Sequence, residues 1–462
     1  MSRGQRSSSG DVVGSLERAV RGHVAWDRAS LRRVGRDGSH LTGRPLAVVA
    51  PADADDVVRA VRWARRTKVP LVARGGGTSL DGESVPRNGS VVLDLSGWNA
   101  LIEVDPAGLW ARVGPGMVNR ELTRALRPQG LFFPPNPGSW TESTIGGNVG
   151  TNASGMRSFR YGATRAWVRE VEAVLGTSAR VRLGSRVAKR SVGPDLLQLF
   201  IGSEGTLGIA TEVTVRLARL PTARQGAIVP LRRSTRLGEL VARLAGLPAS
   251  GLSAVEYLDQ GCARALAERR KARWPRDASL LLLEVEADGP DDARRKMARL
   301  RAVFGTASAD PAGFTVFEDA DELWTLRGES GDVLLERFGY HVREDVAVPL
   351  SAVDRLVDAL AQVARREKVP YFLFGHLGEG SLHPNYAVDP TSPAATRIRA
   401  AVLRASRSLG GTISAEHGIG ALKRAFLTEE LGADAVEILR AVKHACDPDG
   451  ILNPGKLYPG PE

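Results

Sequence analysis

The apolar and polar positions between residues 46 and 74 follow two different periods. Apolar runs at 46–50 and 69–73 flank a stretch, 52–68, in which apolar residues recur every three to four positions. The recurring positions are Val57, Val61 and Ala64. This pattern predicts a strand, an amphipathic helix and a second strand. A strand–helix–strand unit places ligands at the carboxyl end of a strand, where this chain continues into 74-RGGGTS-79.

Further apolar runs predict more strands up to about residue 221. They are 91–95, a hairpin over 102–116 that leads into a helix near 118–125, the strands 169–175 and 179–183, and a closing segment at 202–221. Between them lies a span, 134–162, in which Gly, Asn, Ser and Thr are interleaved. Pro221 and the polar residues after it predict a domain boundary.

From about residue 226 the pattern changes to helical stretches that alternate with short strands. Helices are predicted within 239–247, 291–304 and 352–367, and strands within 280–287, 344–350 and 371–377. This alternation predicts an α+β domain with an antiparallel sheet covered by helices. The expected organisation is an N-terminal lead-in and helix (1–40), a first domain (41–221), a second domain (222–430) and a C-terminal segment that returns to the first (431–462).

Composition and charge narrow the class of protein. A chain of 462 residues is too long for one ordinary core. Its two cysteines, Cys262 and Cys446, are far apart, so they cannot ligate an iron–sulfur cluster within this chain. The net charge of +11 is spread along the sequence and interrupted by acids, which argues against nucleic-acid binding but leaves attraction to an acidic membrane or protein open.

The ends of the chain and its apolar runs bear on localisation. The start, MSRGQRSSSG, lacks an apolar core, so we expect a disordered lead-in rather than a secretory signal. No apolar run reaches transmembrane length. We therefore expect a cytoplasmic protein, with peripheral association at the inner face of the membrane left open.

Three glycine-rich segments are candidates for holding a phosphate-bearing cofactor. They are 73-ARGGGTSL-80, 144-TIGGNVGTNASG-155 and 202-GSEGTLGI-209. Each combines small residues with hydroxyl or amide groups, so that backbone N–H groups can converge on an anion. None matches the GxGxxG or GxxxxGK[ST] pattern, which argues against a Rossmann dinucleotide site and an NTPase loop. Together they could wrap one large cofactor, whereas the alternative is three unrelated turns.

A second candidate site is the stretch 374-FGHLGEGSLHPNY-386, which holds two of the seven histidines. A hairpin with Glu379-Gly380 as its turn would place Leu377 opposite Leu382 and His376 opposite His383. Facing side chains have Cβ atoms roughly 5 Å apart, close enough for two imidazoles to share one metal ion. From these residues alone, a metal site and a hydrogen-bonded histidine pair remain equally compatible.

These motifs, in this order, resemble the FAD-binding domain of the vanillyl-alcohol oxidase / p-cresol methylhydroxylase superfamily. The C-terminal half resembles its FAD-linked D-2-hydroxy acid dehydrogenases, namely D-lactate dehydrogenase, the glycolate oxidase FAD subunit and D-2-hydroxyglutarate dehydrogenase. The resemblance runs from about residue 40 to 459. It implies an α+β protein in which a two-subdomain FAD-binding domain precedes an α+β substrate domain with an antiparallel sheet.

The resemblance assigns the cofactor-binding positions. The FAD pyrophosphate would be bound by Arg74, Gly75, Gly76, Gly77, Thr78, Ser79 and Leu80. The flavin and its phosphates would be lined by Pro137, Gly146, Gly147, Asn148, Thr151, Asn152, Gly155, Glu204, Gly208 and Ile209, and contacted by Asn453 in the tail. Some members attach FAD through a histidine of the first loop. Residues 70–90 contain none, so we expect FAD to be bound non-covalently.

The resemblance also supplies a metal site. In its metal-dependent members, the two hairpin histidines and the glutamate of a SAEHGIG motif hold a divalent ion, here His376, His383 and Glu416 with zinc or manganese. Such a site leaves positions open for a substrate. His417 would then be the base that accepts the hydroxyl proton. The alternative is that His417 only orients another group.

Substrate recognition is expected from cationic and amide side chains. Arg327, in a W–x–x–R motif with Trp324, would bind the C1 carboxylate. Arg343 stands where relatives often carry Lys, and Asn385 would donate to the substrate. The chain departs from the family at 379, 381 and 328, where it has Glu, Ser and Gly, and these departures obscure which acid is the substrate.

The resulting hypothesis is an FAD- and metal-dependent oxidation of a D-2-hydroxy acid to the 2-oxo acid. Electrons would pass to a quinone, a cytochrome, an electron-transfer flavoprotein or a separate iron–sulfur subunit, and a homodimer is left open. Two rivals are an FAD-carrying subunit of a glycolate oxidase-type complex and a sugar or aldonolactone oxidase on the same FAD domain. The second rival would not need the two histidines and the glutamate.

Overall fold

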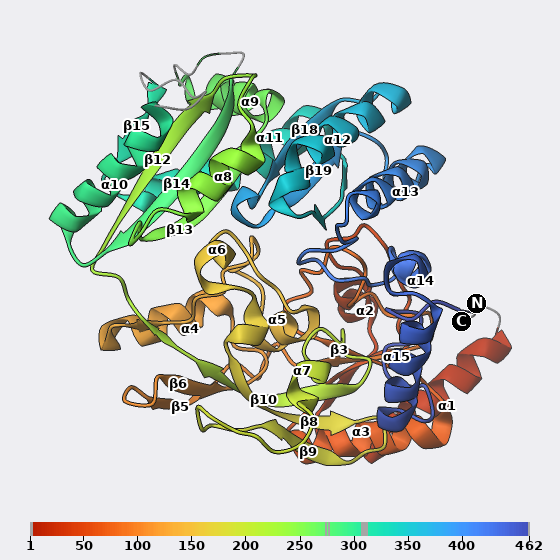
Figure 1. Ribbon diagram of the computed structural model, residues 1–462. Coiled ribbons are helices and arrows are strands. Elements are labelled where there is room, and N and C mark those ends of the chain that lie inside the picture. Colours follow the sequence, from red (N-terminus) through yellow and green to blue (C-terminus); the bar gives the residue numbers. More distant parts are fainter. Residues whose placement is uncertain (1–2, 273–274, 276–277, 306–312, 461–462) are drawn as a thin grey trace. The chain divides into compact units, whose positions relative to one another are not determined.

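The protein is described by a computed structural model that covers residues 3–272, 275, 278–305 and 313–460. The chain forms two compact units (Figure 1). The first comprises residues up to 154, then 163–219 and the segment from Glu416 onward. The second comprises Gly155–Gly162 and Leu220–Ala415. Each unit is described in turn.

The first sheet of unit 1 contains the predicted strand–helix–strand unit. Its strand order is β1-β2-β4-β3, and its bounds are β1 (His23–Ala25), β2 (Ala47–Ala50), β4 (Val91–Asp94) and β3 (Leu71–Arg74). β2, β4 and β3 are parallel, as expected when a helix crosses between strands. That helix, α3 (Ala54–Thr67), is capped by the Asp53 side chain, and its predicted apolar face is fully buried. The glycine loop therefore leaves the carboxyl end of β3, as predicted.

The second sheet of unit 1 is antiparallel. Its order is β5-β6-β10-β8-β9, with β5 (Leu101–Asp105), β6 (Trp110–Val113), β10 (Gly208–Arg216), β8 (Val168–Leu175) and β9 (Arg180–Gly184). A short ribbon pairs β7 (Leu131–Phe132) with β11 (Ala218–Arg219). The helices of this part are α4 (Asn119–Leu126), α5 (Ile145–Thr151) and α7 (Leu196–Phe200). Each sheet has its own apolar cluster, so the two-subdomain prediction is confirmed.

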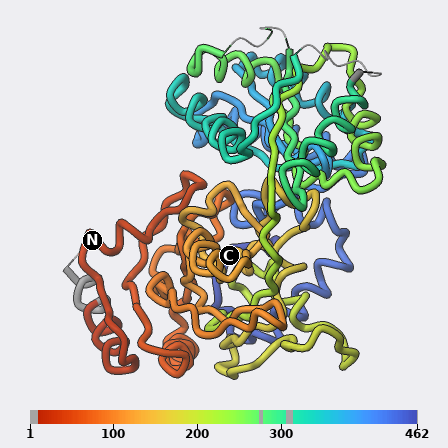
Figure 2. Tube along the Cα trace, turned by 90° about the vertical axis from the view of Figure 1, so that its left-hand side faces the viewer, coloured from red at the N-terminus to blue at the C-terminus, as the bar shows by residue number. Residues whose placement is uncertain are grey.

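The two ends of the chain belong to unit 1. The predicted disordered lead-in is wrong for the part described, because α1 runs from Arg3 to Ala19. Val13 and Leu16 anchor this helix in the core beside Trp63 of α3, and a helix that is anchored propagates more readily than an isolated one. At the other end, α15 (Ala433–Cys446) leads into a tail in which the Leu71 amide of β3 donates to Ile451. Figure 2 shows this C-terminal segment, in blue, among the segments of the first unit.

Unit 2 is built on one antiparallel sheet, as predicted. Its order is β15-β12-β14-β13-β18-β19-β16, with β17 also paired to β19. The bounds are β15 (Thr315–Phe317), β12 (Ala223–Leu231), β14 (Ser279–Ala287), β13 (Leu252–Leu258), β18 (Tyr371–Gly375), β19 (Ser381–Tyr386), β16 (Val342–Arg343) and β17 (Val346–Ala347).

Helices cover this sheet on both sides of its long central strands. α9 (Gln260–Arg270) and α11 (Ala320–Phe338) pack on an apolar cluster that includes Ile228, Leu280 and Leu282. α10 (Pro290–Gly305) and α8 (Leu237–Ala245) pack against each other, and α12 (Val353–Glu367) packs on α13 (Pro393–Ser408). The predicted α+β fold of this domain, with an antiparallel sheet covered by helices, is thus confirmed.

The limits of the units differ from the expected domain limits in two places. Unit 2 ends at Ala415, whereas the expected limit is 430. The residues that follow bond to unit 1, since the Ile419 amide donates to Glu204 and the Ala421 amide donates to Asp81. In addition, the short segment Gly155–Gly162, which contains α6 (Ser158–Tyr161), belongs to unit 2 although its neighbours in sequence do not.

A helix that crosses a lipid bilayer must be both long and apolar. Among the described residues, no helix combines sufficient length with sufficient apolar character to span a membrane.

Candidate active site

The three glycine-rich segments come together within unit 1. A Cβ on Gly75 would lie 2.1 Å from the Thr144 hydroxyl oxygen, and one on Gly76 would lie 2.3 Å from the Glu142 carbonyl oxygen. The first and second segments can therefore touch only because both positions lack a side chain. The second and third segments are joined by hydrogen bonds, because the Gly202 and Glu204 amides donate to the carbonyl oxygens of Val149 and Gly150. The reading as three unrelated turns is excluded.

The first loop offers a row of backbone donors. Among the described residues, the N–H groups of 75–80 donate to no protein acceptor. The Arg74 side chain folds beneath this loop, where its guanidinium occupies the space next to Gly77, which has a φ of +67°. Burial lowers the pKa of Arg74, against the opposing effect of Asp37 and Asp94. A cation below a row of unbonded amides is suited to a diphosphate.

The second segment contains buried polar atoms that lack a partner. Among the described residues, Asn148 Nδ2 and Ser143 Oγ are buried and make no hydrogen bond. A buried polar group without a partner costs about 1–3 kcal/mol, so such atoms point to a ligand that satisfies them. Together with the amides of 75–80, they fit the polar edges of FAD. Asn148 was predicted from the sequence and Ser143 was not.

Several other predicted cofactor positions have roles within the protein. Gly208 and Ile209 pair with Leu175 and Val174 at the start of β10, and Ile209 is packed in the core. The Asn453 amide donates to the carbonyl oxygens of Glu83 and Glu204, which ties the tail to the third glycine-rich segment and to the residues that follow the first. The remaining predicted positions, Pro137, Gly146, Gly147, Thr151, Asn152 and Gly155, lie in or beside the second segment.

Glu204 stabilises the loop that carries Glu416 and His417. Its buried carboxylate accepts hydrogen bonds from the amides of Ile419 (2.7 Å) and Gly420 (2.9 Å). Burial raises the pKa of Glu204 to about 7, although these two amides oppose the shift. The neighbouring carboxyl of Glu83 also has a raised pKa, first because of burial and then because of Glu204. At the start of the same loop, Glu416 accepts a hydrogen bond of 2.8 Å from Ser154, and the His417 ring nitrogen lies 3.8 Å from Glu416.

The histidine hairpin is present in unit 2, but its predicted register is wrong. His383 is opposite Phe374, not His376, so the pairing is shifted by two residues. The loop is longer than a two-residue turn because Leu377–Glu379 form a 3₁₀ turn closed by Gly380 at a φ of +73°. Leu382 is accordingly paired with Val346 rather than with Leu377.

The two imidazoles meet in spite of this shift. Side chains alternate with a period of two along a strand, so a shift of two residues leaves His376 and His383 on the same side. Their ring centroids are 5.0 Å apart with an interplanar angle of 83°. One ring nitrogen of His376 and one ring nitrogen of His383 lie within 4.8 Å of each other, so both could bind the same metal ion. The pair is nearly buried.

A buried carboxylate lies beside each histidine. His376 Nδ1 is 2.5 Å from Glu256 Oε1, and His383 Nδ1 is 3.5 Å from Asp345 Oδ1. Metal-binding histidines usually have a hydrogen-bonded carboxylate on the nitrogen that does not bind the metal, because it fixes the ring and its tautomer. Glu256 is such a partner for His376, whereas His383 and Asp345 are within ion-pair distance without a hydrogen bond between these two atoms. The donor set and its surroundings therefore fit a metal ion better than a simple histidine pair.

Glu256 also holds the predicted carboxylate-binding arginine. Arg327 Nε donates to Glu256 Oε2 at 2.8 Å, and both side chains are buried. Burial alone would raise the pKa of Glu256, but His376 and Arg327 outweigh it and lower that pKa. The guanidinium of Arg327 also lies over the Phe374 ring at 4.5 Å from its centre.

The other two predicted substrate residues contact each other. Arg343 Nε donates to Asn385 Oδ1 at 3.2 Å, and the Asn385 amide donates to the carbonyl oxygen of His383. Arg343 also lies over Phe374, at 5.8 Å. Unit 2 thus places His383 and two arginines around the Phe374 ring, with His376 next to His383 and Asn385 next to Arg343.

Trp324, the other residue of the W–x–x–R motif, has a structural partner. Its indole N–H donates to Glu284 Oε2 at 2.5 Å. Glu284 is fully buried and also receives a bidentate pair of hydrogen bonds from Arg157 of the 155–162 segment, at 2.8 and 3.2 Å. Burial would raise the pKa of Glu284, but Arg157 and its other partners lower it.

The sequence analysis missed Glu256, Asp345 and Phe374 as members of the site. A signal for Glu256 exists: it is an acid in the apolar strand 252-LSAVEYL-258, and an acid at a buried strand position requires a charged or hydrogen-bonding partner. Nothing in the spacing of Asp345 or Phe374 distinguishes them from ordinary strand residues.

Comparison with protein families gives two matches that together span most of the chain. Residues 45–184 match an FAD binding domain, and residues 202–457 match the family described as FAD linked oxidases, C-terminal domain.

Three curated proteins are similar along nearly their whole length. The glycolate oxidase subunit GlcD of Bacillus subtilis is 34% identical, over 90% of this chain and 89% of its own. A D-2-hydroxyglutarate dehydrogenase of Xanthomonas citri is 33% identical, over 96% of each chain. A D-lactate dehydrogenase of Archaeoglobus fulgidus is 32% identical, over 89% of this chain and 91% of its own.

Solved structures establish the fold independently. A 4-ethylphenol oxidase from Gulosibacter chungangensis superposes with a TM-score of 0.80 at 18% identity, covering 100% of this chain and 98% of its own. A p-cresol methylhydroxylase superposes with a TM-score of 0.80 at 16% identity, covering 99% and 97%. At these identities the likeness is one of fold, and it confirms the predicted superfamily architecture.

Proposed function

We propose that this chain, which belongs to the FAD linked oxidases, oxidises a D-2-hydroxy acid to the 2-oxo acid with the help of a divalent metal ion. The chain is an FAD-dependent oxidoreductase of the glycolate, D-lactate and D-2-hydroxyglutarate dehydrogenase type. The observation that carries this proposal is the group in unit 2. Two histidines face each other, each beside a buried carboxylate, next to two arginines on one phenyl ring.

The metal ion would be zinc or manganese, held by His376, His383 and Glu416. Since Nδ1 of each histidine is directed at a carboxylate, Nε2 is the nitrogen that would bind the ion. The carboxylate of Glu416 is the third ligand proposed from the SAEHGIG motif. Chain connectivity supports it, because the amide of the preceding residue, Ala415, donates to Asp345 at 2.8 Å.

FAD, when bound non-covalently, supplies the hydride acceptor at N5, and the metal ion supplies a positive charge that lowers the pKa of the substrate hydroxyl. The protein's own residues do the rest. Arg327 binds the C1 carboxylate through its terminal N–H groups, because Nε is engaged by Glu256. Asn385 and Arg343 donate to the substrate as well, and His417 accepts the hydroxyl proton at a ring nitrogen.

The substrate would be a small acid of the D-lactate, glycolate or D-2-hydroxyglutarate class. Arg327 and Arg343 both lie over the ring of Phe374, so two guanidinium groups face the same volume. Two cations favour a substrate that carries two carboxylates over one that carries a single carboxylate. D-2-hydroxyglutarate is accordingly the acid that we expect to react fastest.

Reduced flavin would be reoxidised by an external acceptor, such as a quinone, a cytochrome, an electron-transfer flavoprotein or a separate iron–sulfur subunit. We place the protein in the cytoplasm or at the inner face of the membrane. The Bacillus subtilis relative is a glycolate oxidase subunit, which favours a second possibility, in which the chain is the FAD-carrying subunit of a larger complex. Co-purification of further subunits with the tagged chain from its own cells tests that possibility.

The experiment that tests the proposed function is a flavin titration without oxygen. The purified protein, its flavin spectrum recorded, is mixed with D- and L-2-hydroxy acids with and without chelator. We expect bleaching by one D-acid, loss of bleaching with EDTA, and recovery with zinc or manganese. Bleaching that is insensitive to EDTA would contradict the metal alone, whereas no bleaching by any hydroxy acid would contradict the dehydrogenase activity.

A further inference from the structure

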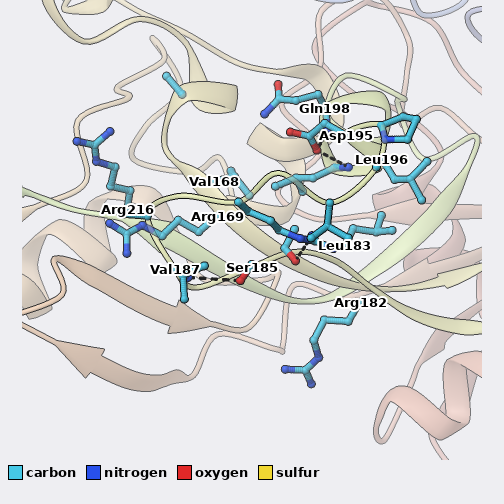
Figure 3. A pocket seen from close by; sticks show the side chains of 18 residues that line it. Val168, Arg169, Arg182, Leu183, Ser185, Val187, Asp195, Leu196, Gln198 and Arg216 are labelled. Atoms are coloured by element: carbon cyan, nitrogen blue, oxygen red, sulfur yellow. Dashed lines mark hydrogen bonds between the residues drawn. The ribbon is translucent and has the colours of Figure 1, made fainter.

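Unit 1 has a second feature that the proposed reaction does not use. A hollow of about 630 Å³ lies at its surface, between the ends of β8, β9 and β10 and the segment 185–198, which includes part of α7 (Figure 3). It contains none of the predicted cofactor, metal or substrate residues. Two properties of the segment 185–199, which we call the basic–apolar loop, set it apart from the surrounding surface.

The first property is the exposure of apolar side chains. Eleven large hydrophobic side chains are exposed among the described residues, and four of them lie in this one loop. They are Val187 (63% exposed), Val192 (69%), Leu196 (58%) and Leu199 (47%). In α7, Leu197 and Phe200 point into the core, so the outer face of this short helix is also apolar. Exposed apolar side chains gathered in one place indicate a contact surface.

The second property is an excess of positive charge. Four arginines line the hollow, and the only acid among its 18 lining residues is Asp195, whose carboxylate caps the amides of Leu197 and Gln198. Two further basic residues, Arg186 and Lys189, lie in the loop itself.

Among the described residues, most of these cations form no ion pair with an acid. Arg190 and Arg169 donate to the carbonyl oxygens of Gly184 and Arg186, not to carboxylates. Arg216 lies over the Trp167 ring at 5.4 Å. The pKa of Arg169 is lowered, first by burial and then by the nearby positive charge of Arg216. By contrast, Arg182 and Arg186 face Glu170 and are partly neutralised.

We propose that the basic–apolar loop docks on an anionic phospholipid surface, with its valines and leucines among the headgroups and its lysine and arginines on the phosphates. The chemistry of the loop favours lipid over an acidic protein. Lys189 and Arg190 lie between the two exposed valines, and the exposed leucines follow on the outer face of α7. Aliphatic side chains next to a group of cations are typical of interfacial membrane anchors.

Flotation with lipid vesicles tests this proposal on the full-length protein with its flavin. Vesicles of phosphatidylcholine alone are compared with vesicles in which a third of the lipid is phosphatidylglycerol, at low and at high salt. We expect the protein to float with the anionic vesicles only, and high salt to weaken the binding.

Two variants separate the contributions, and a third serves as their control. In the charge variant, Lys189→Glu with Arg190→Glu, binding should weaken by at least about thirtyfold, because each Lys or Arg near an anionic surface contributes about a fivefold factor. In the apolar variant, Val187, Val192, Leu196 and Leu199 are changed to Ser, and binding should weaken by at least about tenfold. The matched control, Arg28→Glu with Arg32→Glu on the exposed face of α2 (Arg28–Val34), changes the net charge equally. It should bind nearly as well as the natural protein.

The outcomes are distinct from those of the flavin titration. Flavin content and melting temperature verify that each variant is folded. Equal loss in the control variant would overturn the proposal, because binding would then follow net charge and not this loop. The proposal also fails if anionic vesicles never float the protein, or if the loop instead cross-links to an acidic protein in the absence of lipid.

Discussion

Glu256 is the residue whose replacement probes the proposed site most deeply without touching a proposed ligand. Its carboxylate is fully buried and divides its two oxygens between His376 and Arg327. Replacement by Gln keeps the size and one acceptor oxygen but removes the charge. It also places an N–H₂ group, which can only donate, against either His376 or Arg327, both of which are donors to the carboxylate.

The magnitude follows from burial. Removing one partner of a buried ion pair destabilises a protein by about 3–5 kcal/mol, because the other charge stays buried without compensation. Arg327 is buried, but it retains its contact with the Phe374 ring, which is worth about 1 kcal/mol or more. We therefore expect Glu256→Gln to reduce the free energy of unfolding by about 3 kcal/mol. Loss of a carboxylate that orients a metal-binding histidine should also weaken metal binding about 10–100-fold.

Two assays measure these effects, and a matched variant controls for them. Urea unfolding monitored by tryptophan fluorescence gives the stability change, and zinc titration against a competing chelator gives the metal affinity. Glu322→Gln, on an exposed position at the start of α11, makes the same chemical change at the surface and should alter neither quantity. If Glu256→Gln behaves like Glu322→Gln in both assays, Glu256 does not hold His376 and Arg327 in place, contrary to the prediction.

Three further predictions concern other parts of the chain. Glu284→Gln should destabilise the protein by about 3–5 kcal/mol, because it removes the buried charge to which Arg157 donates two hydrogen bonds. Since the pKa of Glu284 is lowered, its stabilisation is complete above its ordinary pKa of 4.5 and is lost as the pH falls below that value; urea titrations between pH 7 and pH 3 should detect this loss in the natural protein and not in the variant. Gly380→Ala should cost roughly 2 kcal/mol or more in thermal unfolding, because a Cβ there meets the Val348 carbonyl oxygen at 2.1 Å and the backbone is left-handed. Asn148→Leu should lower the amount of flavin retained on gel filtration, measured as the ratio of absorbance at the flavin band to that at the protein band. It should not lower the melting temperature of the flavin-free protein, because the amide nitrogen that it removes has no protein partner among the described residues.

Much of the architecture could be predicted because local patterns and global fold agree. The amphipathic helix over α3, the parallel strands beside it and the antiparallel sheet of unit 2 all follow from the spacing of apolar residues. The prediction of a disordered N-terminal segment was wrong. It was made because a Gly- and Ser-rich start has low intrinsic helix propensity. Residues such as Val13 and Leu16, further along the same helix, pack in the core and extend the helix toward the start.

The site was harder to predict in detail. His376 and His383 could be paired from sequence, because the observed shift of two residues keeps both side chains on one side of the hairpin and close together. The correct register could not, since it depends on a 3₁₀ turn and on the fit of Gly380 against Val348. Glu256, on β13, and Asp345, between β16 and β17, are distant from the hairpin in sequence, and only strand pairing in the folded sheet brings them to the histidines.

The central claim is that this FAD-dependent oxidoreductase takes a hydride from a D-2-hydroxy acid. The most direct test is the rate of anaerobic flavin bleaching by D-2-hydroxyglutarate, D-lactate and glycolate, each chiral acid compared with its L-enantiomer. We predict bleaching by the D-enantiomer of at least one acid, at least tenfold slower bleaching by its L-enantiomer, and strong loss of the rate in Arg327→Met. Equal rates with both enantiomers, or no bleaching by any of these acids, would contradict the claim.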